Sequence, residues 1–265
     1  MRIVHLSDAH VSRESKPYLP GVDLGARCRK AVRACAALQP AADLVMLGGD
    51  MLDDGPTPDY RTLAGLLEGL AAPVHLCLGN HDSLDAFRLA PLPTFPAGCG
   101  GYYSFGAGDL RLINLFTAAE RRGKGSIDRA QLEWLGSELE TTRRALIFMH
   151  HPPVDVGIPW LDAIKLGNSL EFWEIVEPFA ARIEGIFFAH VHMQLSLERG
   201  GILLASPPAA GWQFRADPVA ARAETSDELP GFNVIDTWTA ESSQGAGSGN
   251  EKPPRLTVRT VRFRP

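Results

Sequence analysis

The side chains in this sequence that could do chemistry are aspartate, asparagine and histidine residues that directly follow short apolar runs. They fall into five groups: Asp8-Ala9-His10, Gly48-Gly49-Asp50, Gly79-Asn80-His81-Asp82, His150-His151-Pro152-Pro153 and Ala189-His190-Val191-His192. One such group alone is more typical of a turn or of a polar pair at a strand end. Five groups that share the same three residue types indicate a common site.

Metal binding is the chemistry that these residue types favour. Two carboxylates, one amide oxygen and four imidazoles suit two borderline divalent ions in nitrogen and oxygen surroundings. The candidate ligands are Asp8, His10, Asp50, Asn80, His150, His190 and His192. No cysteine accompanies them, which argues against a structural zinc site. Alternation along an extended strand places both residues of a D-x-H or H-x-H pair on one side, as a pair of ligands requires.

The elements that must position these side chains are indicated by the apolar periodicity. Short apolar runs predict strands at 3–6, 44–47, 74–78, 110–116, 145–149 and 185–188; helical patterns predict helices at 25–38, 59–70, 128–140 and 169–181. Ser126 is the expected N-terminal cap of the third helix. This alternation predicts an α/β domain, in which ligands gather beyond the carboxyl ends of the strands. We therefore expect five strand ends of one sheet to converge on one crevice.

The C-terminal part of the chain has a different pattern. Residues 231–238 and 255–263 alternate apolar and polar side chains, which predicts two half-exposed antiparallel strands joined by a flexible Ser/Gly-rich loop at 240–254. Residues 209–229 are polar and irregular and give no assignment. No repeat or composition break divides the chain, so we expect one domain over 1–265, with the motifs at 8–192 and the C-terminal strands and loop at 193–265.

Composition excludes several classes of protein. The 26 Lys and Arg residues against 31 Asp and Glu residues give a net charge of −5, so no global basic surface for a nucleic acid polymer or an anionic membrane is expected. No long apolar run predicts a membrane span, and no secretory signal is evident, which favours a cytoplasmic protein. Cys28 and Cys35, seven residues apart, are expected as reduced core thiols on one helix face.

In order and spacing, the five groups resemble the calcineurin-like metallophosphoesterase superfamily, whose pattern runs D-x-H, G-D, G-N-H-[DE], H and G-H-x-H. Leu6-Ser7-Asp8, the His-His-Pro-Pro stretch and the segment 156–162 leading to Asn168 resemble most closely the bacterial class III cyclic-nucleotide and glycerophosphodiester phosphodiesterases. Ala189 departs from the pattern, which usually has glycine before H-x-H. The resemblance implies a four-layer αββα sandwich with a C-terminal antiparallel hairpin.

The resemblance also implies roles for the candidate residues. One ion would be held by Asp8, His10, Asp50 and His192, and the second by Asp50, Asn80, His150 and His190, with Asp50 as the bridging catalytic ligand. Asn80 and His81 would contact the substrate. His81 binds no metal in this scheme and is the candidate general acid or hydrogen-bond donor. The two ions are expected to be Fe, Mn, Zn or Co.

The function that follows is hydrolysis of a small phosphodiester, either a 3′,5′-cyclic nucleotide or a glycerophosphodiester. Two metal ions about 3.5–4 Å apart can share the attacking hydroxide and bind phosphoryl oxygens. Their charge would attract an anionic diester although the whole chain is acidic. Alternatives are a phosphomonoester, a nucleoside polyphosphate, a nuclease target, or a non-catalytic interaction module, which would be expected to lose ligands. A homo-oligomer is a further expectation from the resemblance.

Other polar and aromatic side chains near the five groups have more ordinary interpretations. His5 lies inside a predicted strand and is expected in the core, and His151 is expected on the opposite face from His150. Asp53 is expected in a loop at the rim of the site. Trp160 fits a pocket wall and the core equally well.

Overall fold

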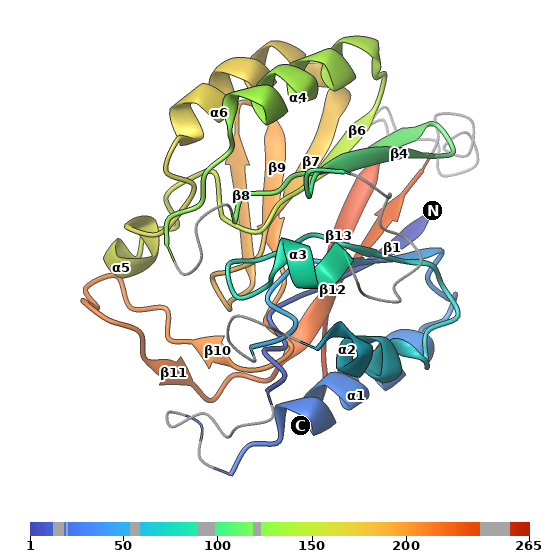
Figure 1. The fold of residues 1–265 in the computed structure, drawn as a ribbon, viewed down its shortest axis with the longest axis vertical. Helices are drawn as coiled ribbons and strands as arrows, with labels where there is room; N and C mark the ends of the chain where they lie inside the picture. The colour runs from blue at the N-terminus through green and yellow to red at the C-terminus, as the bar shows by residue number, and fades with distance from the viewer. Residues whose placement is uncertain (13–18, 20, 54–58, 89–98, 119–122, 239–254) are drawn as a thin grey trace, which may run out of the picture.

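Two β-sheets that pack face to face are the framework of the protein (Figure 1). The computed structural model describes residues 1–12, 19, 21–53, 59–88, 99–118, 123–238 and 255–265. The five-stranded sheet has the order β13-β12-β1-β2-β3, formed by Leu256–Arg262, Gly231–Thr237, Arg2–Leu6, Leu44–Leu47 and Val74–Leu76. The six-stranded sheet has the order β4-β5-β6-β7-β9-β8, formed by Tyr103–Ala107, Leu110–Asn114, Ala145–Phe148, Ile183–Phe187, Ile202–Ser206 and Leu195–Arg199.

Helices cover the outer face of each sheet, which completes the four layers that the resemblance implies. Helices α1 (Leu24–Ala36) and α2 (Tyr60–Leu67) lie at the bottom of Figure 1, and α4 (Arg129–Thr141) and α6 (Ser169–Val176) lie at the top. Shorter elements are α3 (Leu84–Arg88), α5 (Pro159–Asp162) and a 3₁₀ turn, η1 (Glu177–Arg182). The expected αββα fold is therefore confirmed.

The central parallel strands are largely apolar because both of their faces are buried. In β1, Val4 and Leu6 pack beneath α1 and α2, whereas Ile3 packs between the sheets against Phe148 and Phe187. A third cluster lies beneath α4 and α6. These three apolar clusters, one beneath each pair of helices and one between the sheets, hold the parallel strands in place, and the carboxyl ends of the strands face a common edge.

Aspartate side chains cap the N-termini of three helices. Asp23, Asp59 and Asp128 each accept a hydrogen bond from a backbone N–H in the first turn of α1, α2 and α4. The expectation that Ser126 caps the third helix is wrong, because Asp128 lies next to the helix and its carboxylate reaches the N–H of Gln131 at 2.8 Å.

Several element boundaries also differ from those expected. The predicted helix at 169–181 ends at Val176 and continues as the 3₁₀ turn, since Pro178 has no N–H to donate to an α-helical bond. The predicted strands at 74–78 and 110–116 end earlier, at Leu76 and Asn114. The antiparallel pair β12–β13 is confirmed, and the predicted loop at 240–254 lies outside the described residues.

The cysteines are free thiols, and Cys28 and Cys35 are buried on α1 as expected. Burial raises the pKa of both thiols to about 12. Among the described residues, no helix has the length and apolar character needed to span the lipid bilayer.

The buried position of His5 predicts how the stability of the protein depends on pH. Its ring lies between the sheets, edge-on to Phe148 and Phe187, and neither ring nitrogen has a hydrogen-bond partner among the described residues. Burial, with a smaller contribution from His150, lowers the pKa of His5 to about 3. From about pH 6.5, the ordinary histidine pKa, down to about pH 3, the unfolded chain therefore binds a proton that the folded chain does not.

We expect the free energy of unfolding to fall as the pH is lowered through this window, with His5 contributing at most about 1.4 kcal/mol per pH unit. Urea unfolding of chelator-treated protein between pH 4 and 6.5 measures the slope. The variant His5→Leu should show a shallower slope than the wild-type protein. Parallel slopes would show that His5 is protonated in the folded state or does not titrate.

Candidate metal centre

The five groups of candidate ligands meet at one edge of the sandwich, but they come from both sheets. Those that contain Asp8, Asp50 and Asn80 follow β1, β2 and β3, whereas those that contain His150 and His190 follow β6 and β7. The expectation of a single sheet is therefore wrong. Face-to-face packing brings the carboxyl ends of two parallel sets of strands together, and hydrogen bonds join the sets directly.

One set of side chains gathers around Asp8, His10 and His192. The Nε2 atoms of His10 and His192 lie 3.0 Å apart, and His192 Nε2 lies 3.6 Å from Asp8 Oδ1. Three side chains from the segments after β1 and β7 thus bring their donor atoms together, which is the arrangement that a cation requires.

A second set gathers around His150. Its Nε2 atom lies 3.1 Å from Asn80 Oδ1 and 3.3 Å from His190 Nδ1. Asp50 connects the two sets, because its Oδ2 atom is 3.3 Å from His150 Nε2 and 3.8 Å from His10 Nε2. Asp50 therefore occupies the position between the sets that a bridging ligand needs.

Backbone carbonyls fix the orientation of two of the imidazoles. Nδ1 of His150 donates to the carbonyl of Gly48 at 2.8 Å, and Nδ1 of His192 donates to the carbonyl of Trp212 at 2.9 Å. Because a carbonyl only accepts, Nδ1 carries the proton in both rings and Nε2 faces the other candidate ligands. Such partners orient metal-binding histidines in proteins generally.

The backbone at the strand ends adopts a conformation that is uncommon outside glycine. Five of the candidate ligands have a positive φ: Asp8 (53°), His10 (46°), Asp50 (51°), His190 (72°) and His192 (48°). A non-glycine residue held in this region costs about 1–3 kcal/mol. The left-handed conformation thus occurs after β1, β2 and β7, and the strain coincides with five of the seven candidate ligands.

Close backbone packing explains two glycines of the site. A Cβ atom on Gly49, whose φ is 97°, would lie 2.5 Å from the backbone nitrogen of Gly79, and a Cβ atom on Gly79 would overlap the carboxylate of Asp50. Ala189, where the family pattern has glycine, is buried and is not among the residues with positive φ. Alanine therefore fits at position 189 without strain.

The charges of the site favour ionised Asp50 beside protonated His150 when metal is absent. Burial alone would raise the pKa of Asp50 and lower that of His150. Their mutual attraction outweighs burial, so the pKa of Asp50 falls well below its usual value and that of His150 rises to about 9. Burial lowers the pKa values of His190 and His192, which keeps these rings neutral and ready to ligate.

Comparison with known proteins agrees with this geometry. The family model of calcineurin-like phosphoesterases matches residues 1–194, which includes all five groups. The chain is a calcineurin-like phosphoesterase. It is an enzyme of the phosphoester hydrolase class, and its family uses divalent metal ions.

Relatives of this phosphoesterase cover nearly its whole length. A 3′,5′-cyclic-nucleotide phosphodiesterase of Nostoc sp. is 26% identical over 90% of each chain. A probable glycerophosphodiester phosphodiesterase GpdQ of Arcobacter nitrofigilis is 25% identical and covers 91% of this chain and 90% of its own. A dimetal phosphatase structure from Danio rerio shares the fold, with a TM-score of 0.61, 14% identity, and coverage of 88% of this chain and 91% of that one.

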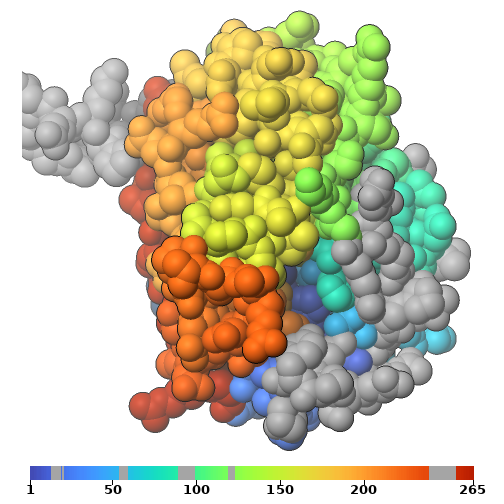
Figure 2. Space-filling view, turned by 90° about the vertical axis from the view of Figure 1, so that its left-hand side faces the viewer, coloured from blue at the N-terminus to red at the C-terminus, as the bar shows by residue number. Residues whose placement is uncertain are grey.

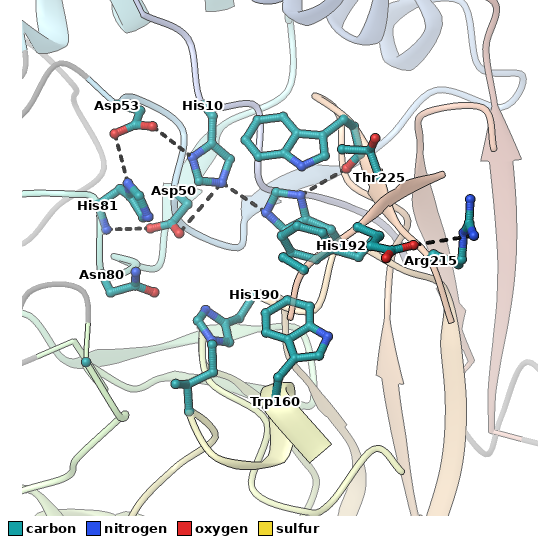
Figure 3. Close-up of a pocket in the computed structure, with 16 residues that line it drawn as sticks. His10, Asp50, Asp53, Asn80, His81, Trp160, His190, His192, Arg215 and Thr225 are labelled. Carbon is teal, nitrogen blue, oxygen red and sulfur yellow. Dashed lines mark hydrogen bonds and ion pairs between the residues drawn. The ribbon is translucent and has the colours of Figure 1, made fainter. Parts of the chain in front are cut away.

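His81 of the phosphoesterase lies beside His10 and Asp53, and the ligand atoms of these three side chains are close enough together to hold a cation. Its Nδ1 atom donates to Asp53 Oδ1 at 2.8 Å, and its backbone N–H donates to Asp50 Oδ1 at 2.7 Å. The ring packs edge-on against His10 and stays 24% exposed. Figure 3 shows His81, Asp53 and His10 grouped on one side of the pocket. His81 therefore lies at the edge of the first set of candidate ligands, with part of its ring exposed.

Asp53 is the residue of the site that the sequence interpretation placed wrongly. It is 8% exposed rather than part of a rim loop, because Leu52 pairs with Val11 and the backbone N–H of Asp53 donates to the carbonyl of Val11. Its second carboxylate oxygen lies 3.7 Å from His10 Nδ1. Asp53 lies three residues after Asp50, in the segment that follows β2. This spacing is the sequence signal that could have indicated Asp53 as a residue of the site.

Two other neighbours of the ligands have supporting contacts. Asp82 accepts hydrogen bonds from the backbone N–H groups of Asp50 and Gly79, at 2.7 and 2.8 Å. His151 hydrogen-bonds Thr117 through Nδ1 at 2.8 Å. Asp82 thus fixes the two loops that carry the candidate ligands Asp50 and Asn80.

A cavity of about 930 Å³ opens over the metal centre. Figure 2 shows the recess between the yellow-green region around α5 and the orange hairpin below it. The hairpin consists of β10 (Gln213–Phe214) and β11 (Thr225–Ser226), within the stretch 209–229 that the sequence left unassigned. Trp160 lines the cavity, whereas its neighbour Leu161 is buried in the core. Alternation of Trp212 and Phe214 is the local signal for this wall.

Proposed function

We propose that this phosphoesterase binds two divalent metal ions and hydrolyses a small phosphodiester, either a 3′,5′-cyclic nucleotide or a glycerophosphodiester. The observation that carries the proposal is the position of Asp50 Oδ2 between two sets of ligand-type side chains at the floor of the cavity. The names of relatives that align over about nine-tenths of the chain support the diester class.

The donor atoms fit the two ions. Asp8, His10 and His192 would hold one ion, and Asn80, His150 and His190 the other, with Asp50 shared; Fe, Mn, Zn and Co all accept such nitrogen and oxygen ligands. The Nε2 atoms of His10 and His192 lie 3.0 Å apart, so both could face the same ion. When bound, two such ions stabilise charge on phosphoryl oxygens and activate water as a nucleophile.

The remaining steps depend on residues of the chain itself. Asp53 holds the proton of His81 on Nδ1, and His81 lines the cavity. From there a protonated His81 ring would donate to the leaving oxygen of the diester as the ester bond breaks. The amide of Asn80, next to it, lines the same cavity and would contact the phosphoryl group.

A metal-reconstituted activity panel tests the proposal. Protein loaded separately with Mn, Fe, Zn or Co is assayed with bis-p-nitrophenyl phosphate, p-nitrophenyl phosphate, cyclic AMP and glycerophosphodiesters, and metal content is measured in the same samples. We expect diesters to be preferred to the monoester. A protein with two bound metals that turns over no ester would overturn the proposal, and a preference for the monoester would favour a phosphomonoesterase.

The contact between Asp53 and His81 gives a separate prediction. Replacing Asp53 with asparagine removes the charge that holds the His81 tautomer, and we expect kcat to fall by roughly 10–100-fold, as for other residues that orient a functional group. The pH profile of kcat should shift as well, because the ring loses its carboxylate partner. Asp59→Asn, at the cap of α2, is the matched control and should retain activity. Equal metal loss and activity loss in Asp53→Asn would contradict the positioning role.

A further inference from the structure

The wall of the cavity on the side of α5 and the β10–β11 hairpin is aromatic and apolar. Trp160 from α5 meets Phe214 from β10 edge-on, with ring centroids 4.9 Å apart and an interplanar angle of 89°. Phe214 in turn packs on the ring of His192 at 4.5 Å. Ile164 and Ala223 line the same cavity. The aromatic wall thus begins at a candidate metal ligand and runs outward.

Among the described residues, the polar side chains that line this side, Arg215, Glu224 and Thr225, belong to the β10–β11 hairpin or adjoin it. Arg215 and Glu224 pair across it, with Nη1 and Oε2 at 3.4 Å, and their side chains are 62% and 46% exposed. Thr225 lies beside them in the lining. Figure 3 shows Trp160 and Arg215 on the opposite side of the pocket from His81. A molecule with its phosphate at the metal centre would therefore place its organic part against the aromatic wall and its polar edge near Arg215 and Glu224.

We infer that Trp160, Phe214 and Arg215 form a subsite for a planar heteroaromatic ring, the base of a nucleotide diester. The inference rests on the proposed phosphodiesterase function and selects between its two substrates. A base can stack on an aromatic face, which contributes about 1–3 kcal/mol. The hydroxyls of a glycerol group would lose hydrogen bonds to water against the same wall. The cavity volume of about 930 Å³ also lies in the range of roughly 300–1,000 Å³ that suits a molecule larger than glycerol phosphate.

Trp160 is the residue best suited to a test. Its neighbours anchor α5 independently, because Leu161 is buried in the core and Asp162 accepts a hydrogen bond from the backbone N–H of Val156 at 2.6 Å. The ring of Trp160 packs against Phe214, whereas Phe214 itself contacts the candidate ligand His192. Substitution at 160 can therefore change the wall while the metal centre remains in place.

The test compares cyclic AMP with a base-free analogue, methyl ribofuranoside 3′,5′-cyclic phosphate, which has the same cyclic diester. We expect the wild-type enzyme to prefer cyclic AMP in kcat/KM, and Trp160→Leu to lower this preference by about 5- to 150-fold, the equivalent of one base–aromatic stack. Trp160→Phe should restore most of it. Trp238→Leu, at a partly exposed tryptophan outside the cavity, is the matched control and should keep the wild-type preference.

Equal losses on both substrates in Trp160→Leu, or no wild-type preference for cyclic AMP, would overturn the subsite while leaving the phosphodiesterase proposal intact. Binding without turnover is measured by saturation-transfer NMR on chelator-treated protein with adenosine and ribose. The base protons of adenosine should receive saturation from the wild-type protein and much less from Trp160→Leu. If no ester is hydrolysed, the phosphodiesterase proposal fails, and the adenosine signal alone decides the subsite; its absence overturns the inference.

Discussion

Replacing Asp50 with asparagine is expected to empty both metal sites. The change keeps the shape of the side chain, and asparagine tolerates the positive φ of 51° at this position, so the fold should persist. What is lost is the charge at Oδ2, which lies within 4 Å of both His10 Nε2 and His150 Nε2. We expect the affinity for both ions to fall by more than about 100-fold, beyond the effect of residues that merely orient ligands.

Metal analysis after dialysis against a weak chelator, together with activity, checks this prediction. Asp8→Asn is the informative comparison, because Asp8 belongs to only one of the two sets and should affect one ion more than the other. Two tightly bound ions in Asp50→Asn would contradict a bridging role. Loss of only one ion would assign Asp50 to a single site.

Replacing His81 with alanine is expected to lower kcat by roughly 10²–10⁴-fold, the usual contribution of an acid or base in the transition state. Metal content should stay close to that of the wild-type enzyme. The structural reason is that residue 81 contacts Asp50 through its backbone N–H, at 2.7 Å, and alanine keeps that bond. Only the imidazole, which Asp53 holds at the edge of the cavity, is removed.

Parallel measurement of kcat and metal content separates the two explanations of a defect. A leaving group with a low pKa, such as p-nitrophenolate, needs little protonation, so His81→Ala should lose less activity on bis-p-nitrophenyl phosphate than on cyclic AMP. If metal loss accounts for the whole defect, or if both substrates suffer equally, His81 is not the proton donor.

The local order of the chain was sufficient to place the candidate ligands after strands and to predict most of the strands. A buried parallel strand is a short apolar run, and the residues that follow it are visible in the sequence as D-x-H or H-x-H pairs. Asp8, Asp50 and His150 therefore occupy the strand ends where the sequence places them.

What the sequence could not reveal depends on contacts between distant segments. Periodicity does not assign a strand to a sheet, so nothing local indicates that the groups of Asp8 and His150 belong to different sheets. Asp53 reaches the site because Leu52 pairs with Val11, about forty residues away along the chain. The cavity wall at Phe214 is formed by a two-residue strand, so the alternation of Trp212 and Phe214 is too short a signal to assign it from the sequence.

The positive φ angles at five candidate ligands have a consequence for how this enzyme can be altered. Glycine would adopt the backbone conformation at positions 8, 10, 50, 190 and 192 with less strain, because it has no Cβ to clash in the left-handed region. Selection for thermal stability alone would therefore remove the side chains that the chemistry needs. Stability and activity conflict at these five positions, and engineering for heat resistance should act on the outer helices instead.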